Sequence, residues 1–191
     1  MGDLFALLIG AVLVNNVVLT RFVSMGQILA FSKRFSSALY MGVAAMAVMA
    51  SSAVVNFILY TFLLEPMGFA VMDLVVYVLV ISLMTWLAAR YIKSSKPEIY
   101  EEVKGLLPLL TINSAVLFIA LDNVNQGYDL GQAVVNAIGL PIGLFLAFAV
   151  FGAIKERLDF AEETGSFRGS PILLAVAGLA ALALSGLSGL V

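Results

Sequence analysis

The sequence contains no cysteine and no histidine. A disulfide, a thiolate metal site, an imidazole ligand and an imidazole base are therefore excluded within this chain. Charged residues are also scarce, making up 12% of the 191 residues where soluble domains average about 25%. The chain has no Walker motif, no Gly-rich phosphate loop and no nucleophile–base pair, and nothing in it indicates nucleic-acid binding. Catalysis by the chain on its own is not indicated.

Long apolar stretches are what the sequence has instead. The chain is 62% hydrophobic, and its mean hydropathy is +1.09. Six stretches carry no charged residue at all: 4–20, 35–64, 74–89, 105–121, 130–154 and 171–191. A transmembrane helix needs about 20 residues. We therefore predict an all-α membrane protein, a single integral membrane domain over 1–191 with six transmembrane helices.

The few charges are segregated along the chain. All ten basic residues lie in the first, third and fifth connecting loops, at Arg21, Lys33, Arg34, Arg90, Lys93, Lys96, Lys104, Lys155, Arg157 and Arg168. The second and fourth loops carry only acids, at Glu65, Asp73, Asp122 and Asp129. Basic loops stay in the cytoplasm. The pattern predicts a multi-pass protein of the cell (inner) membrane with both termini on the non-cytoplasmic side.

The first and fourth stretches are short and interrupted by polar residues. The first contains Asn15 and Asn16, and the fourth contains Thr111, Asn113 and Ser114. With a shift of 98 residues, the segment 15–19 (NNVVL) matches 113–117 (NSAVL) at three of five positions. Paired interrupted helices in two halves are typical of inverted repeats with a functional centre at the midplane. We predict inverted three-helix repeats over about 1–95 and 98–191; chance similarity between apolar segments is the alternative.

Two interpretations exist for a side-chain amide inside a span. It links neighbouring helices, contributing about 0.6–2 kcal/mol, or it bonds backbone groups freed where a helix stops. For the breaks at Asn15, Asn16 and Asn113 we favour the second, and for the isolated Asn56 and Asn136 the first. No charged residue lies deep inside a span, which argues against a self-contained ion antiporter or pump.

Several segments resemble a known family. They are 12–22 (VLVNNVVLTRF), 32–33 (SK), 107–113 (LPLLTIN), 153–158 (AIKERL) and 167–169 (FRG). In this order, across nearly the whole chain, they resemble the RnfA/RsxA/NqrE family, membrane subunits of the redox-driven Rnf and Nqr ion pumps. The resemblance implies a homologous membrane partner of opposite topology. It also implies flavin- and iron–sulfur-bearing subunits, and electron transfer coupled to Na⁺ or H⁺ translocation.

The resemblance further implies an iron–sulfur cluster at the interface of the two homologous subunits, held by cysteines near both breaks. The chain departs from the family here, because those cysteines align with Gly26 and Ser114. Gln27 also stands where the family usually has proline, which favours natural divergence. Cluster ligation normally needs thiolates. We therefore expect the chain alone to bind no cofactor and no metal.

Three functions remain open. The first is a subunit of an Rnf- or Nqr-like ion-translocating oxidoreductase that has no redox centre of its own and is non-catalytic by itself. The second is a transporter or channel that kept the inverted-repeat fold and lost the electron-transfer role. The third is a purely structural subunit. The sequence does not distinguish Na⁺ from H⁺ as the coupling ion, and it does not identify the electron donor or acceptor.

Overall fold

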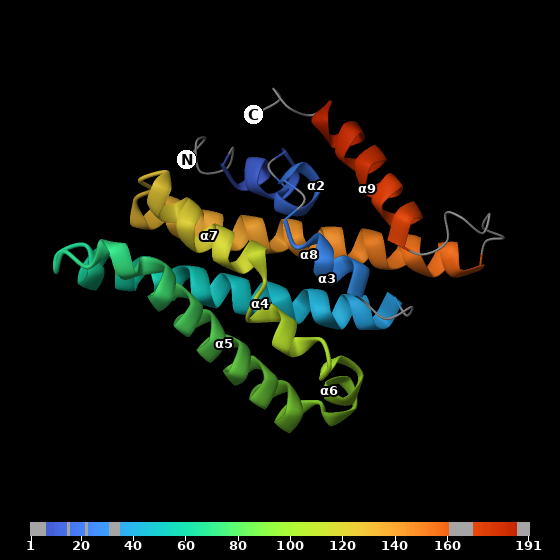
Figure 1. Cartoon of the computed structure of the whole chain (residues 1–191), viewed down its shortest axis with the longest axis horizontal. Coiled ribbons are helices and arrows are strands. Elements are labelled where there is room, and N and C mark those ends of the chain that lie inside the picture. The colour runs from blue at the N-terminus through green and yellow to red at the C-terminus, as the bar shows by residue number, and fades with distance from the viewer. Residues whose placement is uncertain (1–6, 15, 22, 31–34, 161–169, 187–191) are drawn as a thin grey trace.

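The computed structural model of the chain describes residues 7–14, 16–21, 23–30, 35–160 and 170–186 (Figure 1). Within these ranges every regular element is a helix and none is a strand. In chain order they include η1 (Gly10–Val14), α2 (Val17–Arg21), α3 (Met25–Ala30), α4 (Phe35–Leu59), η2 (Tyr60–Leu64), η3 (Ala70–Met72), α5 (Asp73–Ser95), α6 (Pro97–Val103), η4 (Leu107–Leu110), α7 (Ser114–Asn125), α8 (Leu130–Phe160) and α9 (Ser170–Ser185). The predicted all-α class is confirmed for the described part of the chain.

Four helical stretches in the described residues are long and apolar enough to cross a bilayer. They are Phe35–Leu64, Asp73–Ser95, Leu107–Asn125 and Leu130–Leu158, with 30, 23, 19 and 29 residues. About 20 residues suffice for a span. These helices match the second to fifth predicted spans, and a shorter apolar helix, Pro171–Ala183, lies in the sixth. The membrane character of the fold follows from these helices.

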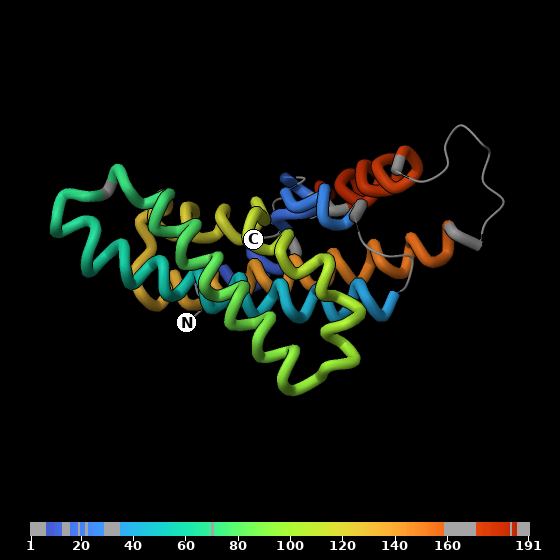
Figure 2. The backbone as a smooth tube through the Cα atoms, turned by 60° about the horizontal axis from the view of Figure 1, so that its bottom comes forward, coloured from blue at the N-terminus to red at the C-terminus, as the bar shows by residue number. Residues whose placement is uncertain are grey.

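α4 and α8 run side by side through the centre of the molecule (Figures 1 and 2). Where they meet, Gly42 of α4 lies against the Phe148 side chain of α8, and Ala38 of α4 lies against Gly152 of α8. Small residues on one helix let the backbones approach, and the aromatic rings of the other fill the space. The long α4–α8 pair is the scaffold on which the interrupted segments lie.

The first and fourth segments are interrupted, as predicted. In the first, the π-helix η1 is followed by Asn16, which is not helical, and then by the short helices α2 and α3. Ser24 lies in the turn between α2 and α3 with a φ of 69°, in the left-handed region that non-glycine residues rarely adopt. In the fourth segment, η4 ends before Asn113, and α7 starts immediately after it.

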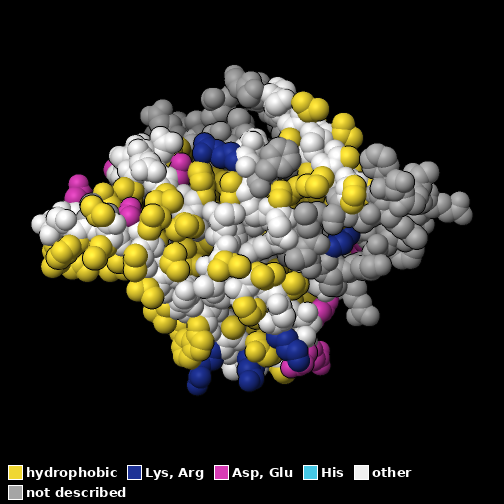
Figure 3. Space-filling model, in the orientation of Figure 1, with side chains coloured by type: hydrophobic (Ala, Val, Ile, Leu, Met, Phe, Trp, Pro, Cys, Tyr) yellow, Lys and Arg dark blue, Asp and Glu magenta, His cyan; other side chains and the backbone are white. Residues whose placement is uncertain are grey.

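The surface divides by charge as the loops do. Figure 3 shows Lys and Arg side chains, with some acids, over the end of the molecule formed by α5 and α6. Only acidic side chains appear at the far left, where α4 connects to α5 and α7 to α8. Apolar side chains cover much of the surface between these ends. An apolar belt between polar ends suits a protein embedded in a bilayer.

Candidate functional site at the two broken segments

The two interrupted segments contact each other through polar side chains. The backbone N–H of Ser24 donates a 3.1 Å hydrogen bond to the Ser114 hydroxyl. The Gln27 side-chain oxygen accepts a 2.6 Å hydrogen bond from the Asn113 amide, and its NH₂ group donates to the carbonyl of Leu109 in η4. Polar side chains of the first segment therefore provide hydrogen-bond partners for polar groups of the fourth segment at the point where its helix is interrupted.

Asn113 is the N-cap of α7. Its backbone is extended, and its side-chain oxygen accepts a 2.7 Å hydrogen bond from the N–H of Ala115. The first N–H groups of a helix have no intrahelical acceptor, and an N-cap side chain supplies one. Asn113 is 2% exposed, and its NH₂ group donates a hydrogen bond to the side-chain oxygen of Gln27. One buried amide thus begins α7 and positions α3 against it.

Asn16 has the same local role in the first segment. Its side-chain oxygen accepts a 3.1 Å hydrogen bond from the N–H of Val18 in the first turn of α2. Its NH₂ group donates to the carbonyl of Gly143 in α8 at 2.8 Å and to that of Val12 at 3.3 Å. The prediction that amides at the breaks bond freed backbone groups is confirmed for Asn16 and Asn113.

The outward partners of the two caps differ, because Asn16 bonds α8 and Asn113 bonds α3. The two capping residues are also 97 positions apart, so the sequence match at a shift of 98 is one residue out of register with the caps. Asn15, the residue that the match pairs with Asn113, lies outside the described residues. The expectation that these amides meet at the membrane midplane stays a prediction.

Two glycines on α8 let the first segment approach closely. A Cβ atom at Gly143 would lie 2.9 Å from the carbonyl oxygen of Val12 and 3.2 Å from the side-chain nitrogen of Asn16. A Cβ atom at Gly139 would lie 2.8 Å from the Cβ of Ala11. Neither glycine has room for a side chain. The GxxxG spacing therefore works as it does in tightly packed membrane helices.

The contact between the breaks encloses a pocket of about 350 Å³. Its lining comes from Ser24, Met25, Gly26, Gln27, Leu109, Ile112, Asn113 and Ser114. Gly26 and Ser114, which the resemblance aligns with the cluster cysteines, thus lie at the same pocket. Both are exposed, whereas Gln27 and Asn113 are buried behind them. Thr111 lies in the break but does not line the pocket.

An iron–sulfur cluster does not fit the donors of this pocket. Hydroxyl and amide groups line it, and neither Gly26 nor Ser114 supplies a thiolate. No group of three or more acidic, Cys or His side chains that could hold a metal occurs in the part of the chain the structure describes. A side chain would still fit at position 26, because a Cβ atom at Gly26 would meet nothing within 4 Å.

Gln27 belongs to the site and Arg21 contacts α7 outside the pocket lining; neither contact was predicted from the sequence. Arg21 follows the first charge-free stretch, so it resembles a loop residue. In the structure its guanidinium lies 4.8 Å from the centre of the Phe118 ring. Phe118 lies within the apolar stretch Leu107–Asn125. A cation beside a span is costly in lipid, so this face favours a protein or water contact. The first charge-free stretch, 4–20, is short for a membrane span, and this could have indicated that Arg21 lies beside the span.

Asn136 and Asn123 link two helices at the acidic end of the molecule. The Asn136 NH₂ group donates to the Asn123 side-chain oxygen at 2.8 Å and to the Asp122 carboxylate at 3.3 Å. The prediction that Asn136 links helices is confirmed. By contrast, the Asn56 side chain is fully buried, and neither of its polar atoms has a hydrogen-bond partner among the described residues.

A second pocket, of about 360 Å³, lies near the Asn123–Asn136 pair and includes Glu65 and Asp129 in its lining. Tyr128 also lines it. Burial, and then the nearby Asp122 carboxylate, raise the pKa of the Tyr128 hydroxyl above its usual value. No basic residue lines this pocket. The charged residues that line it are both acidic, in keeping with the acidic second and fourth loops.

Comparison with known proteins covers the full chain. The profile of a family described as "Rnf-Nqr subunit, membrane protein" matches residues 4–191. The chain is 38% identical over 191 residues to a subunit of the ion-translocating oxidoreductase complex of Syntrophotalea carbinolica, covering 100% of this chain and 99% of that protein. It is 35% identical over 187 residues to a subunit of the Na⁺-translocating ferredoxin:NAD⁺ oxidoreductase complex of Acetobacterium woodii, covering 98% and 97%.

Proposed function

The chain belongs to the Rnf-Nqr family of membrane subunits, and on that basis we propose that it is the RnfA-type subunit of an ion-translocating oxidoreductase complex. The observation that carries this proposal is the full-length similarity to subunits of such complexes at 35% and 38% identity. The contact between the two interrupted segments supports it, because the family-aligned positions Gly26 and Ser114 share one pocket. In this function the chain is an integral scaffold and ion-path element, and the redox centres belong to its partners.

We propose six spans in two inverted repeats, with both termini on the non-cytoplasmic side of the cell membrane. The caps at Asn16 and Asn113 support the repeat in that each starts a helix after a break, although they are 97 and not 98 positions apart. The restriction of all ten basic residues to three alternating loops supports the orientation. Reporter fusions at Gln126 and in the 161–169 segment should report opposite sides of the membrane. The same readout from both positions would reject six spans.

We propose that a homologous membrane subunit of opposite topology binds at the pocket between the breaks. Gly26 and Ser114 are exposed at this pocket, and Ile112 beside them is 79% exposed. Arg21 lies close by against α7 and would be shielded from lipid by such a partner. Flavin- and iron–sulfur-bearing subunits would complete the electron path. A cluster at this interface would need thiolates from the partner, because this chain has none.

The test compares sealed inverted membrane vesicles from cells with and without the gene. The proposal expects that redox-driven uptake of Na⁺ or H⁺ is lost without the chain and returns on complementation. The relative from Acetobacterium woodii is named for Na⁺, so ²²Na⁺ uptake and a pH dye are read in parallel. The competing transporter function predicts that the chain alone in liposomes moves an ion or solute without any electron donor. That result, with redox-driven uptake intact in the deletion strain, would reject the proposal.

A further inference from the structure

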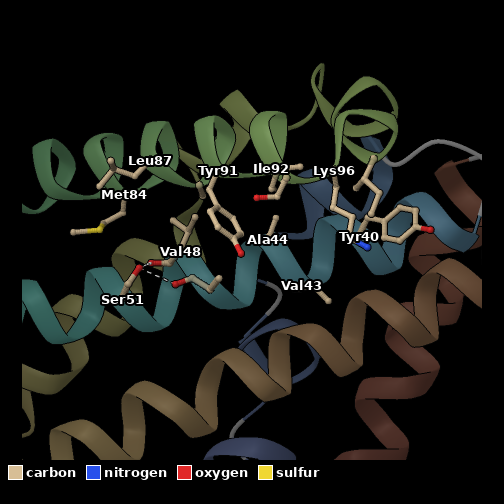
Figure 4. A pocket seen from close by; sticks show the side chains of 14 residues that line it. Tyr40, Val43, Ala44, Val48, Ser51, Met84, Leu87, Tyr91, Ile92 and Lys96 are labelled. Atoms are coloured by element: carbon tan, nitrogen blue, oxygen red, sulfur yellow. Dashed lines mark hydrogen bonds between the residues drawn. The ribbon is translucent and has the colours of Figure 1, made fainter.

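A groove of about 510 Å³ separates α4 from α5 on the surface of the molecule. The two helices lie close together at the 65–72 connection and diverge toward α6 (Figure 1). Small residues keep the groove open, because Ala44 and Ala47 on α4 and Ala88 on α5 line it; Ala44 is labelled in Figure 4. Both helices are candidate membrane spans, so the groove lies at the level of the bilayer.

The groove has the length of one lipid leaflet. It follows α4 from Ser51 to Tyr40, twelve residues whose eleven steps rise about 16 Å at 1.5 Å each. The hydrocarbon core of a bilayer is about 30 Å thick, so one leaflet is about 15 Å deep. The side walls between these ends are mostly apolar, from residues such as Val48 and Leu87. An empty apolar groove would forfeit dispersion contacts, and an acyl chain restores them.

A cation stands at the wide end of the groove. Lys96 is exposed, lines the groove, and reaches toward Tyr40 at that end (Figure 4). Its ammonium has no side-chain partner in the described part of the chain. The other basic residues of this loop are engaged: Arg90 lies over Trp86 at 5.5 Å, Lys93 lies over Tyr100 at 5.7 Å, and Lys104 pairs with Glu101.

The carboxylate of Glu102 on α6 does not line the groove. The Glu102 carboxylate accepts hydrogen bonds from the hydroxyls of Ser36 and Ser37 at the start of α4. The hydroxyl of Tyr91 projects from α5 into the groove, in addition to the Lys96 ammonium (Figure 4). The Lys96 ammonium at the end of a leaflet-deep apolar groove is complementary to a phosphate that carries acyl chains.

We propose that this groove binds one anionic phospholipid, with an acyl chain between α4 and α5 and its phosphate on Lys96. With the orientation proposed above, this lipid belongs to the cytoplasmic leaflet; the site itself does not depend on that orientation. Basic pockets between membrane helices are a recurrent way to select anionic headgroups. The lipid would hold α5 and α6 at a fixed spacing from α4. Neither the redox partners nor the pocket between the breaks is involved.

The test is native mass spectrometry of the purified full chain, delipidated and titrated with phosphatidylglycerol or phosphatidylethanolamine of the same acyl composition. The wild type should retain one phosphatidylglycerol in preference to phosphatidylethanolamine. Lys96→Ala should reduce that preference about fivefold, the effect of one lysine near an anionic headgroup. Lys93→Ala, on the same helix but outside the groove, should leave it unchanged. An unchanged preference in Lys96→Ala would overturn the proposal.

A second pair of variants tests the acyl chain. Ala47→Trp places a bulky ring inside the groove and should abolish retention of either lipid, whereas Leu83→Trp, exposed on α5 outside the groove, should not. In native membranes, a photoreactive residue at Val43 should crosslink to phospholipid, read as a lipid mass on the chain. A crosslink to another polypeptide would show that a protein fills the groove and would refute lipid binding. Such a crosslink would not contradict the proposed function in a redox complex, so the lipid proposal and the functional proposal can be refuted independently.

Discussion

Asn113 is the residue whose replacement tests the architecture of the breaks most sharply. In Asn113→Ala, α7 loses its N-cap, which costs about 1 kcal/mol. The 2.6 Å hydrogen bond to Gln27 is also lost, with a net contribution of about 0.5–1.5 kcal/mol. The free energy of unfolding should therefore fall by about 2 kcal/mol. Asn113→Ser keeps a capping hydroxyl but is too short to reach Gln27, so it should cost about half as much.

The assay is equilibrium unfolding in mixed detergent micelles, followed by far-ultraviolet circular dichroism. Fluorescence is unsuitable, because the single tryptophan, Trp86, lies on α5 and is 56% exposed. A double-mutant cycle with Gln27→Leu should return a coupling of about 1 kcal/mol. Asn56→Leu is the matched control, because this buried amide has no partner among the described residues and should be neutral or stabilising. Coupling near zero, or equal costs for Asn113→Ser and Asn113→Ala, would refute the reasoning.

Three further predictions concern packing, metal and charge at the site. Gly143→Ala should destabilise the protein by about 1–3 kcal/mol relative to Gly178→Ala in thermal unfolding, because only the first Cβ meets neighbouring atoms within 4 Å. The wild-type chain purified alone should contain no stoichiometric iron or sulfide, and Gly26→Cys with Ser114→Cys should create or strengthen visible iron–sulfur absorbance once a partner is present. Arg21→Gln should lower stability by about 0.5–1 kcal/mol in the same unfolding assay, since the cation–π contact is lost; no change would mean that contact contributes nothing.

The sequence predicted the helical class and the position of both breaks. Asn16 and Asn113 indicated the positions of the breaks, because a buried amide in an apolar stretch must bond a polar group. Gly139 and Gly143 have the GxxxG spacing that is typical of close helix packing, and the structure places them against the first segment. These features are local, so composition and spacing were sufficient to find them. Six spans and the inverted repeat remain proposals.

The tertiary contacts of the site could not be predicted in the same way. Gln27 and Arg21 follow the first apolar stretch, where a polar or basic residue is normally a loop residue. The turn at Ser24 precedes α3 and places Gln27 against the fourth segment, and no pattern in the sequence specifies its left-handed backbone. The groove between α4 and α5 was missed as well. Alanines such as Ala47 look like ordinary packing residues until the helices are seen to diverge.

The most direct test of the account is the composition of the complex that contains this chain. The tagged chain is purified from native membranes in a mild detergent, and its partners are identified and counted by mass spectrometry. The account predicts equal amounts of a homologous membrane subunit, together with flavin- and iron–sulfur-bearing subunits. Recovery of the chain alone, or only with copies of itself, from membranes that retain redox-driven ion uptake would contradict it.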